Sequence, residues 1–259
     1  MEEKNRTAGS GRGIFQAASG KLPQAGAGDK AGGRTLEVLA GILVFLTVVC
    51  VCVAFTLNCR ALYRYDCDHL NIPAQSGFSR ELCLENYDIM IDYNNIGGPD
   101  TLEFVEFPMS ETARIHFEQV RQIFLTIEWF AIFGGAASIL CAVWFLRRRR
   151  TRWMRTAGWL GLAVPLTLGL LISANWDDVF ITFHQLVFNN DYWLFDPATD
   201  PVILILPDTF FMHCAVMIVA LILAVSAVLL ILQRILFRWA ESGTAEAAAS
   251  EDQRRESRD

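Results

Sequence analysis

The sequence predicts a mainly α-helical, polytopic membrane protein: a bundle of four transmembrane helices with a small extracytoplasmic cap that contains short β-strands. Two observations predict this class. Of the 259 residues, 53% are hydrophobic and only 19% are charged, and the mean hydropathy is +0.32, whereas soluble domains carry about 25% charged residues. The apolar residues also gather in blocks long enough for a helix to cross a hydrocarbon core about 30 Å thick. These features exclude a disordered chain and disfavour a soluble cytosolic enzyme.

Four such blocks follow one another along the chain. A lipid-crossing segment is expected to be helical, because a helix satisfies its own backbone polar groups. The second block contains one acid, Glu128, and the third contains Pro165, which kinks a helix but is tolerated within a bundle. The predicted spans are residues 36–58, 123–146, 157–175 and 209–236.

Basic residues gather on one side of these spans. Residues 1–36 and 147–156 carry six each and residues 233–259 carry five, whereas segments 58–122 and 175–209 hold eleven and six acids against five and no basic residues. The positive-inside rule therefore predicts cytoplasmic termini, a cytoplasmic 147–156 loop and outward-facing acidic loops. The arginine run is interpreted as a topology anchor on anionic membrane lipid, so no nucleic-acid partner is expected.

The segments outside the spans differ in composition. Residues 1–35 and 237–259 show no apolar period and are predicted to be disordered cytoplasmic tails. Residues 59–122 are too many for a structureless connector and form the predicted cap, and residues 176–208 form a second outer loop. Gly26–Ala31 matches a dinucleotide fingerprint in form, but no strand precedes it, so the match is attributed to chance.

Local patterns predict the structure of the cap. Tyr87–Tyr93 and Thr101–Phe107 alternate well enough for two short strands, separated by a turn at residues 95–99. Ser110 is a predicted helix N-cap with Glu111 in the first turn. This helix is expected to continue into the second membrane span.

Three cysteines, Cys59, Cys67 and Cys83, lie in the cap, where one disulfide is possible and the sequence leaves the pairing open. The run Cys67-Asp68-His69 contains metal-ligating residue types, but a zinc site needs a fourth ligand that the sequence does not place. This run is therefore interpreted as part of the cap structure.

The second outer loop is unusually aromatic. Its rings suit an aromatic belt at the headgroup level, which is the commoner arrangement, or the wall of a pocket between cap and bundle. They are Trp176, Phe180, Phe183, Phe188, Tyr192, Trp193 and Phe195.

Two histidines, His116 and His184, are predicted near the boundary between bundle and cap. Because histidine titrates near neutral pH, such a pair can remove a proton from an amine and donate one to an oxyanion, although each can also be an ordinary interfacial residue. Asp177 shares a helical face with His184 but lies about 10 Å away along the axis, so another segment must supply any orienting carboxylate. His213 and Glu128, which lie within predicted spans, are further ionisable candidates.

At these residues the sequence resembles the lipoprotein intramolecular transacylase family. The resemblance covers about residues 36–235, and Gln119 departs from it, standing where the family pattern has an Asp. The matching positions are Phe107-Pro108-Met109-Ser110, His116-Phe117, Val120, Asp178, Phe183-His184, Phe188, Asn190-Asp191, Trp193, Asp196-Pro197, Asp200-Pro201 and Pro207.

The resemblance implies a four-helix membrane enzyme of the bacterial cytoplasmic membrane, with its active site at the extracytoplasmic face. Its substrates would be lipoproteins with a diacylglyceryl-modified N-terminal cysteine, whose sn-2 acyl chain moves to the cysteine's own α-amino group. No cofactor and no metal are implied. The functional histidines of the family correspond to His116 and His184; we expect His184 to act as general base and His116 as donor, although their roles could be exchanged. The expected substrate-binding residues are Trp176, Phe183, Phe188, Trp193 and Asp178.

Two other functions remain open from the sequence. A metal-dependent outer-face hydrolase would use His116, His184 and either Asp177 or Asp178. A non-catalytic membrane assembly or sensor protein would need neither histidine.

Overall fold

A computed structural model describes residues 27–257, except for the side chains of residues 27–31, 171–174, 239–252 and 254–256. The described residues divide into two units at Thr35, and every functional feature described below lies after that residue. The elements are helices joined by turns and irregular loops, and residues 27–257 contain no strand. In order they are α1 (Ala27–Asn58), α2 (Arg60–His69), α3 (Ile72–Ser76), α4 (Arg80–Tyr93), α5 (Glu111–Arg147), α6 (Arg152–Ala174), α7 (Trp176–Val187), the 3-10 helix η1 (Pro201–Ile205) and α8 (Asp208–Glu256).

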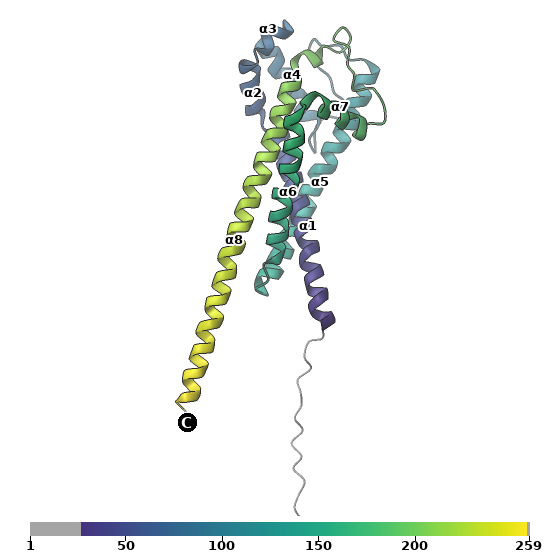
Figure 1. Cartoon of the computed structure of the whole chain (residues 1–259). Coiled ribbons are helices and arrows are strands. Elements are labelled where there is room, and N and C mark those ends of the chain that lie inside the picture. The colour runs from purple at the N-terminus through teal and green to yellow at the C-terminus, as the bar shows by residue number, and fades with distance from the viewer. Residues whose placement is uncertain (1–26, 258–259) are drawn as a thin grey trace, which may run out of the picture. The chain divides into compact units, whose positions relative to one another are not determined.

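Four long helices, α1, α5, α6 and α8, form an apolar stem (Figure 1). Within the described part of the chain, three helical segments are long and apolar enough to cross a membrane: Gly32–Asn58, Glu111–Arg147 and Asp208–Arg238. The remaining predicted span, residues 157–175, lies in α6, which contains Pro165. The protein is therefore a helical membrane protein.

Small residues bring the stem helices together. A Cβ atom on Gly41 of α1 would lie 2.6 Å from Thr156 Cβ of α6, and one on Gly134 of α5 would lie 2.9 Å from Thr47 Oγ1 of α1. The Thr47 hydroxyl also lies 3.1 Å from the Ser138 hydroxyl, at hydrogen-bonding distance. Close backbone approach and hydroxyl hydrogen bonds are typical of helix packing in lipid, where burial of apolar surface supplies no driving force.

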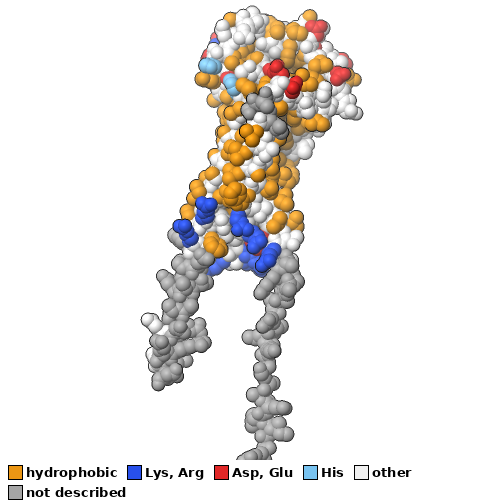
Figure 2. Space-filling view, in the orientation of Figure 1, with side chains coloured by type: hydrophobic (Ala, Val, Ile, Leu, Met, Phe, Trp, Pro, Cys, Tyr) orange, Lys and Arg blue, Asp and Glu red, His pale blue; other side chains and the backbone are white. Residues whose placement is uncertain are grey.

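Glu37 links α1 to the start of α6 at one end of the stem. This carboxylate is only 7% exposed, accepts a hydrogen bond from the backbone N–H of Arg152 at 3.2 Å, and lies 3.6 Å from the Arg150 guanidinium. It thus occupies the positive end of α6, where a negative charge is favoured. On the face shown in Figure 2, basic side chains gather at one end of the apolar stem and acidic ones at the other.

The cap is built from α2, α3, α4, the loop 94–110 and η1, which together surround a core that also includes the first turn of α8. Tyr63 of α2 stacks on Tyr87 of α4 with ring centroids 3.8 Å apart, and Phe210 of α8 meets the Tyr63 ring edge-on at 5.2 Å. The Tyr63 hydroxyl donates a hydrogen bond to the Ile205 carbonyl at 2.8 Å. These contacts fix the cap to the top of α8.

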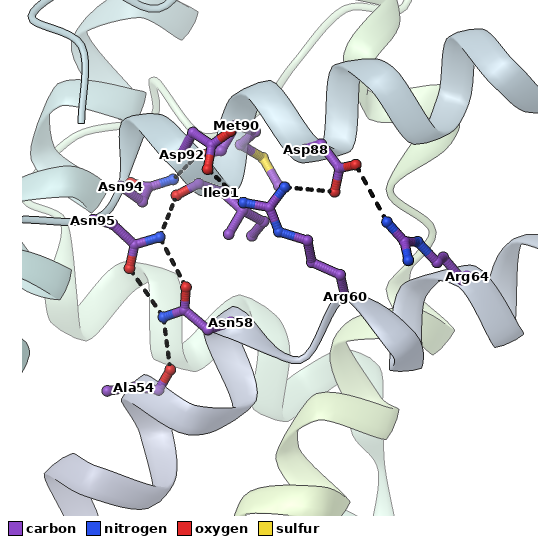
Figure 3. A network of polar contacts seen from close by, with 10 residues as sticks. All are labelled: Ala54, Asn58, Arg60, Arg64, Asp88, Met90, Ile91, Asp92, Asn94 and Asn95. Atoms are coloured by element: carbon purple, nitrogen blue, oxygen red, sulfur yellow. Dashed lines mark hydrogen bonds and ion pairs between the residues drawn. The ribbon is translucent and has the colours of Figure 1, made fainter.

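A polar network joins the top of α1 to the end of α4 (Figure 3). Asn58 and Asn95 exchange two side-chain hydrogen bonds of 2.9 Å. Arg60 forms ion pairs with Asp88, at 3.0 Å, and with Asp92. Because reciprocal amide pairs and shared guanidinium pairs restrict geometry, the network sets how the cap continues from the first stem helix.

The prediction of two strands in the cap is wrong. Tyr87–Tyr93 forms the last two turns of α4, and residues 101–107 are irregular. The buried α4 residues recur with the helical period, as Cys83, Tyr87 and Met90 show, and the Ser79 hydroxyl caps the helix by accepting from Leu82 N–H at 3.1 Å. The irregular loop is held instead by Asn86, whose side chain bonds both the N–H and the carbonyl of Val105.

Helices also extend into both segments that were expected to be disordered. α1 begins at Ala27 and α8 ends at Glu256, while residues 1–26 and 258–259 lie outside the described residues. The 244–249 stretch is rich in alanine, the strongest helix former, which favours continuation of α8. As predicted, a helix begins after Ser110 and continues without interruption to Arg147.

Candidate active site

His116 lies in the second turn of α5, before the predicted span 123–146. The Ser110 hydroxyl starts this helix by accepting from Ala113 N–H at 3.1 Å, and Glu111 lies in the first turn. His116 is only 7% exposed. Three rings surround it: Phe188 at 4.7 Å, Phe195 at 5.5 Å and Phe117 at 6.0 Å between centroids.

His184 lies on α7 and is half-buried. Its Nδ1 atom is 2.8 Å from the carbonyl oxygen of Phe180, one turn earlier. Since a carbonyl only accepts, Nδ1 carries the proton in this contact and Nε2 is left with the lone pair. The fold thus presents the basic nitrogen of His184 away from its own helix.

The structure brings the two histidines together. Their ring centroids are 6.1 Å apart and the planes are inclined by 32°. Phe188 contacts both rings, since it also lies 5.7 Å from His184, and Trp193 lies 4.7 Å from His184. A reacting group placed between two such rings could form a hydrogen bond of ordinary length to each.

The aromatic surroundings keep both imidazoles neutral. Burial is the main cause, and the charge of a protonated His184 nearby is the second; together they lower the pKa of His116 from 6.5 to about 4. Burial also lowers the pKa of His184, against opposing contributions from the Phe180 carbonyl and the Asp208 carboxylate. At neutral pH the site therefore holds two imidazoles able to accept a proton.

Three buried nitrogens around the site have no hydrogen-bond partner among the residues described: His116 Nδ1, Trp176 Nε1 and Trp193 Nε1. Trp193 lies against His184, and Trp176 lies 6.0 Å from Phe180, which in turn lies 4.2 Å from His184. Buried polar atoms are normally paired, because an unpaired one costs about 1–3 kcal/mol. These nitrogens are candidates for bonding a polar substrate.

Two hydrogen bonds hold the loop after α7 against α5. Asp200 accepts from the Ser110 N–H at 2.6 Å, and Asn190 donates to the Gln119 side chain at 3.3 Å. Gln119 thus makes a polar contact one turn after His116. The loop supplies Phe188, Trp193 and Phe195, so these bonds position much of the aromatic wall.

The aromatic residues predicted to bind substrate differ in how far they are buried. Phe188 is buried at 6% exposure, whereas Phe183, whose ring lies 5.5 Å from His184, is 53% exposed. The Asp178 carboxylate accepts a hydrogen bond from the Asn175 side chain at 2.7 Å in the first turn of α7. Asp178 therefore stabilises the start of the helix that carries His184.

The other ionisable candidates belong to the framework. Glu128 accepts the backbone N–H of Ile96 at 2.8 Å and so ties the 94–110 loop to α5. His213 Nδ1 lies 2.9 Å from the buried Asp66 carboxylate, which links α8 to α2. His69 stacks on Tyr65 at 5.1 Å on the outside of the cap.

The cysteines of the cap are free thiols. Cys67 and Cys83 are both fully buried in the cap core, and burial raises the pKa of Cys67 to about 11. Asp68 pairs with Arg80 at 2.6 Å. Cys67-Asp68-His69 is thus divided between a buried thiol, an ion pair and an exposed ring, in accord with its interpretation as cap structure.

No three His, Cys, Asp or Glu side chains form a potential metal-binding cluster within the described part of the chain. The arrangement that the hydrolase alternative requires, His116 and His184 with Asp177 or Asp178, is therefore not found there.

The sequence analysis did not select two rings, Phe180 and Phe195, or two carboxylates, Asp200 and Asp208, as site residues, although both rings were named in the aromatic loop and Asp200 in the family resemblance. Phe180 precedes His184 by four residues and shares its helical face, a relation that could have been used. Phe195, Asp200 and Asp208 reach the site through loop and tertiary geometry. No local pattern marks these three.

Comparison with known proteins gives a family and a fold. The family model described as lipoprotein intramolecular transacylase Lit matches residues 38–211. The structure of the membrane integral lipoprotein intramolecular transacylase Lit from Bacillus cereus is similar at a TM-score of 0.80 and 28% identity, covering 82% of this chain and 99% of that chain.

Two further structures of the Bacillus cereus protein each carry one histidine mutation. The alanine variant has a TM-score of 0.74, covering 82% of this chain and 97% of that chain, and the arginine variant has 0.70, covering 83% and 98%, both at 28% identity. No sequence among the curated proteins matches this chain.

Proposed function

The chain belongs to the lipoprotein intramolecular transacylase Lit family, and we propose from this premise how its two histidines carry out the reaction. The enzyme moves the sn-2 acyl chain of a diacylglyceryl-modified N-terminal cysteine to the α-amino group of that same cysteine. The observation that carries the proposal is the pair of imidazoles, 6.1 Å apart, within a wall of aromatic rings.

The reaction joins two groups of one molecule. The amine nitrogen attacks the ester carbonyl, a C–N bond forms, and the bond from the carbonyl carbon to the glyceryl oxygen breaks. The amine loses a proton and the glyceryl oxygen gains one, leaving an amide and a free hydroxyl. Because nucleophile and electrophile are already tethered, no acyl-enzyme is needed, and the main demands are folding the substrate and moving protons.

His184 is the proposed general base. Its Nδ1 proton is engaged by the Phe180 carbonyl, so Nε2 is the free acceptor, and burial keeps the ring neutral at pH 7. A neutral acceptor can take the proton of an α-amino group, which has a pKa near 8. The proton then passes to the leaving glyceryl oxygen.

His116 is the proposed donor to the carbonyl oxygen. Its Nδ1 has no partner among the described residues, and a neutral ring with its proton on Nδ1 would direct that N–H to the developing oxyanion. Donors held in a buried aromatic site stabilise such charge more strongly than water does, because they need no reorganisation. The Nδ1 atom of His184 is hydrogen-bonded, whereas that of His116 has no partner among the described residues. This difference favours His184 as base and His116 as donor over the reverse assignment.

The aromatic residues form the proposed substrate enclosure. Phe188 and Trp193 would exclude water from the reacting groups, and the Trp193 and Trp176 N–H groups would bond ester or peptide oxygens. Phe183, at the exposed side of His184, would contact an acyl chain. Asp178 would contribute indirectly, by accepting a hydrogen bond from Asn175, the N-cap of α7.

The proposed membrane arrangement has four spans, 36–58, 123–146, 157–175 and 209–236. Both termini and the 147–156 loop would face the cytoplasm of a bacterial cell, with the cap and the histidines at the extracytoplasmic face. Two features support it: the separation of basic and acidic ends (Figure 2), and the apolar surface of α7, where Leu186 is 81% exposed. An amphipathic helix with such a face suits the lipid interface, where membrane lipids would contact it.

Mass spectrometry of a lipoprotein N-terminus tests the function directly. A lipoprotein produced with the wild-type enzyme should carry an amide-linked chain and a lyso-glyceryl group. His116→Asn and His184→Asn should abolish this product while membrane insertion is retained. His69→Asn is the matched control, since that histidine lies on the outside of the cap, and it should leave the product unchanged.

The same experiment separates the alternatives. Release of free fatty acid with chelator sensitivity would indicate a metal-dependent hydrolase. An unchanged acyl arrangement in the presence of the wild-type protein would favour a non-catalytic membrane role and end the proposal.

A further inference from the structure

A cavity of about 460 Å³ lies between α6 and α8, at the end of the stem opposite the cap. It is lined by Arg155, Arg234, Arg238 and Gln233, together with the rings of Trp159 and Phe237. Its volume is in the range of small-molecule sites, about 300–1,000 Å³. It shares no residue with the histidine site.

Two glycines explain why the cavity forms at this level. A Cβ atom on Gly161 would lie 1.9 Å from Ser226 Oγ, and one on Gly158 would lie 2.6 Å from Leu230 Cγ. α6 and α8 therefore touch at these glycines. One turn further along, the facing positions carry Arg155 and Arg234, which line the cavity.

The cavity is strongly basic. Three arginines line it, and none of the lining side chains that the structure describes is a carboxylate. Among the side chains that the structure describes, no ion pair is formed by these three arginines, whereas Arg150, at the same end, pairs with Glu37. Guanidinium groups remain charged at all accessible pH values and bind phosphate oxygens in pairs.

The rest of the lining is apolar and opens to the surface of the stem. Trp159 is 57% exposed and Phe237 is 50% exposed. A free phosphate ion would use the arginines and leave these rings without a partner. A ligand with both a phosphodiester and hydrocarbon chains would use both parts.

We propose that this cavity is a binding site for an anionic phospholipid of the adjacent leaflet. Its phosphodiester would contact Arg155, Arg234 and Arg238, and its acyl chains would lie along Trp159 and Phe237. The position of the cavity, at the basic end of the stem, suits such a lipid, because basic pockets between transmembrane helices bind anionic headgroups on the positive side of a membrane. This site would link α6 and α8 through a bound lipid without taking part in the acyl transfer.

Native mass spectrometry of the full-length protein, released from nanodiscs, tests the site. With wild-type protein, phosphatidylglycerol should be retained over phosphatidylcholine, and inorganic phosphate should not compete at equal concentration. Retention of both lipids alike, or full competition by phosphate, would overturn the proposal. This comparison uses the wild-type protein alone, so it does not depend on whether a variant folds.

Paired variants then locate the binding. Arg155→Gln/Arg234→Gln should weaken phosphatidylglycerol retention by at least about tenfold, since charge-assisted hydrogen bonds are lost. Arg147→Gln/Arg149→Gln removes the same charge from the exposed loop outside the cavity and should change retention less than twofold. Equal losses in the two pairs would mean general attraction to a basic surface, and the site would be rejected.

Discussion

Asp200 accepts a hydrogen bond from the backbone N–H of Ser110 at 2.6 Å. Its second carboxylate oxygen accepts from the Thr199 hydroxyl at 2.7 Å, and the side chain is buried. The bond joins the loop that carries Phe188 and Phe195 to the first turn of the helix that carries His116. A residue with no contact to either imidazole thus helps to set the spacing of the site.

Replacing Asp200 should therefore impair both folding and activity. Asp200→Ala leaves the Ser110 N–H unpaired and is expected to cost about 1.5–3 kcal/mol, seen as a lower unfolding midpoint and reduced lyso-lipoprotein formation. Asp200→Asn keeps an acceptor oxygen and should recover most of the activity. Asp191→Ala, on the exposed part of the same loop, serves as control; equal effects of the two alanine variants would contradict the positioning role.

The pH dependence follows from the lowered histidine pKa values. Since burial favours the neutral rings, the folded protein binds fewer protons than the unfolded chain between pH 6.5 and about 4. The stability due to His116 is therefore complete above pH 6.5 and is lost as pH falls toward 4. Activity should likewise hold from pH 7 to 6.5 and decline below the lowered pKa of His184.

Unfolding midpoints and initial rates measured from pH 4 to 8 check this. His116→Asn should lose part of the acid dependence of stability. A wild-type rate that already falls between pH 8 and 7 with an enzyme-side pKa above 6.5 would contradict neutral, buried imidazoles.

Phe188 and Phe183 form a matched pair for the aromatic wall. Phe188 is buried against both histidines, so Phe188→Ala should destabilise the protein by about 3–5 kcal/mol and strongly reduce activity. Phe188→Leu restores much of the volume and should recover stability more than activity. Phe183→Ala, at an exposed position, should leave the unfolding midpoint almost unchanged. A larger loss of stability in Phe183→Ala than in Phe188→Ala would contradict the proposed roles of these two rings.

Trp193→Phe removes the unpartnered N–H and keeps an aromatic ring near His184. If that N–H bonds the substrate, activity should fall at least about tenfold, as for loss of a single oxyanion donor, while the unfolding midpoint stays within about 1 °C or rises, because an unpaired buried donor is removed. Steady-state product formation and thermal unfolding of the same preparation give both values. Unchanged activity would assign Trp193 to packing alone.

The strongest local patterns in the sequence predicted the parts of the site that lie on helices. Ser110 followed by Glu111 marked the start of α5, and the two histidines were placed at matching depths by the lengths of the apolar blocks. Their meeting requires α7 to lie beside α5, which no local pattern states; the resemblance to a family supplied that expectation. Residues 177–184 were treated as helical in the sequence analysis, but the bounds of α7 as a separate helix were not predicted.

The errors have a common physical origin. In Tyr87–Tyr93 the apolar residues fit a period of two over seven residues, but the same residues also fit the helical period once Cys83 and the Ser79 cap are included. A short window cannot separate the two periods. Asp200 and Phe195 were named in the sequence analysis, but their roles at the site were not predicted because their contacts join segments about 80–90 residues apart.

Helix α5 carries His116 near one end and the lipid-crossing segment below it, without interruption over 37 residues, or about 55 Å. Such a rod responds to a thicker or thinner bilayer by changing its tilt. A few degrees of tilt of α5 in the hydrocarbon core would move His116 at its end. His184 lies on the separate short helix α7 and would not move with it. Membrane thickness is therefore mechanically linked to the geometry of the reacting pair, and lipid chain length becomes a variable that any assay of this enzyme has to fix.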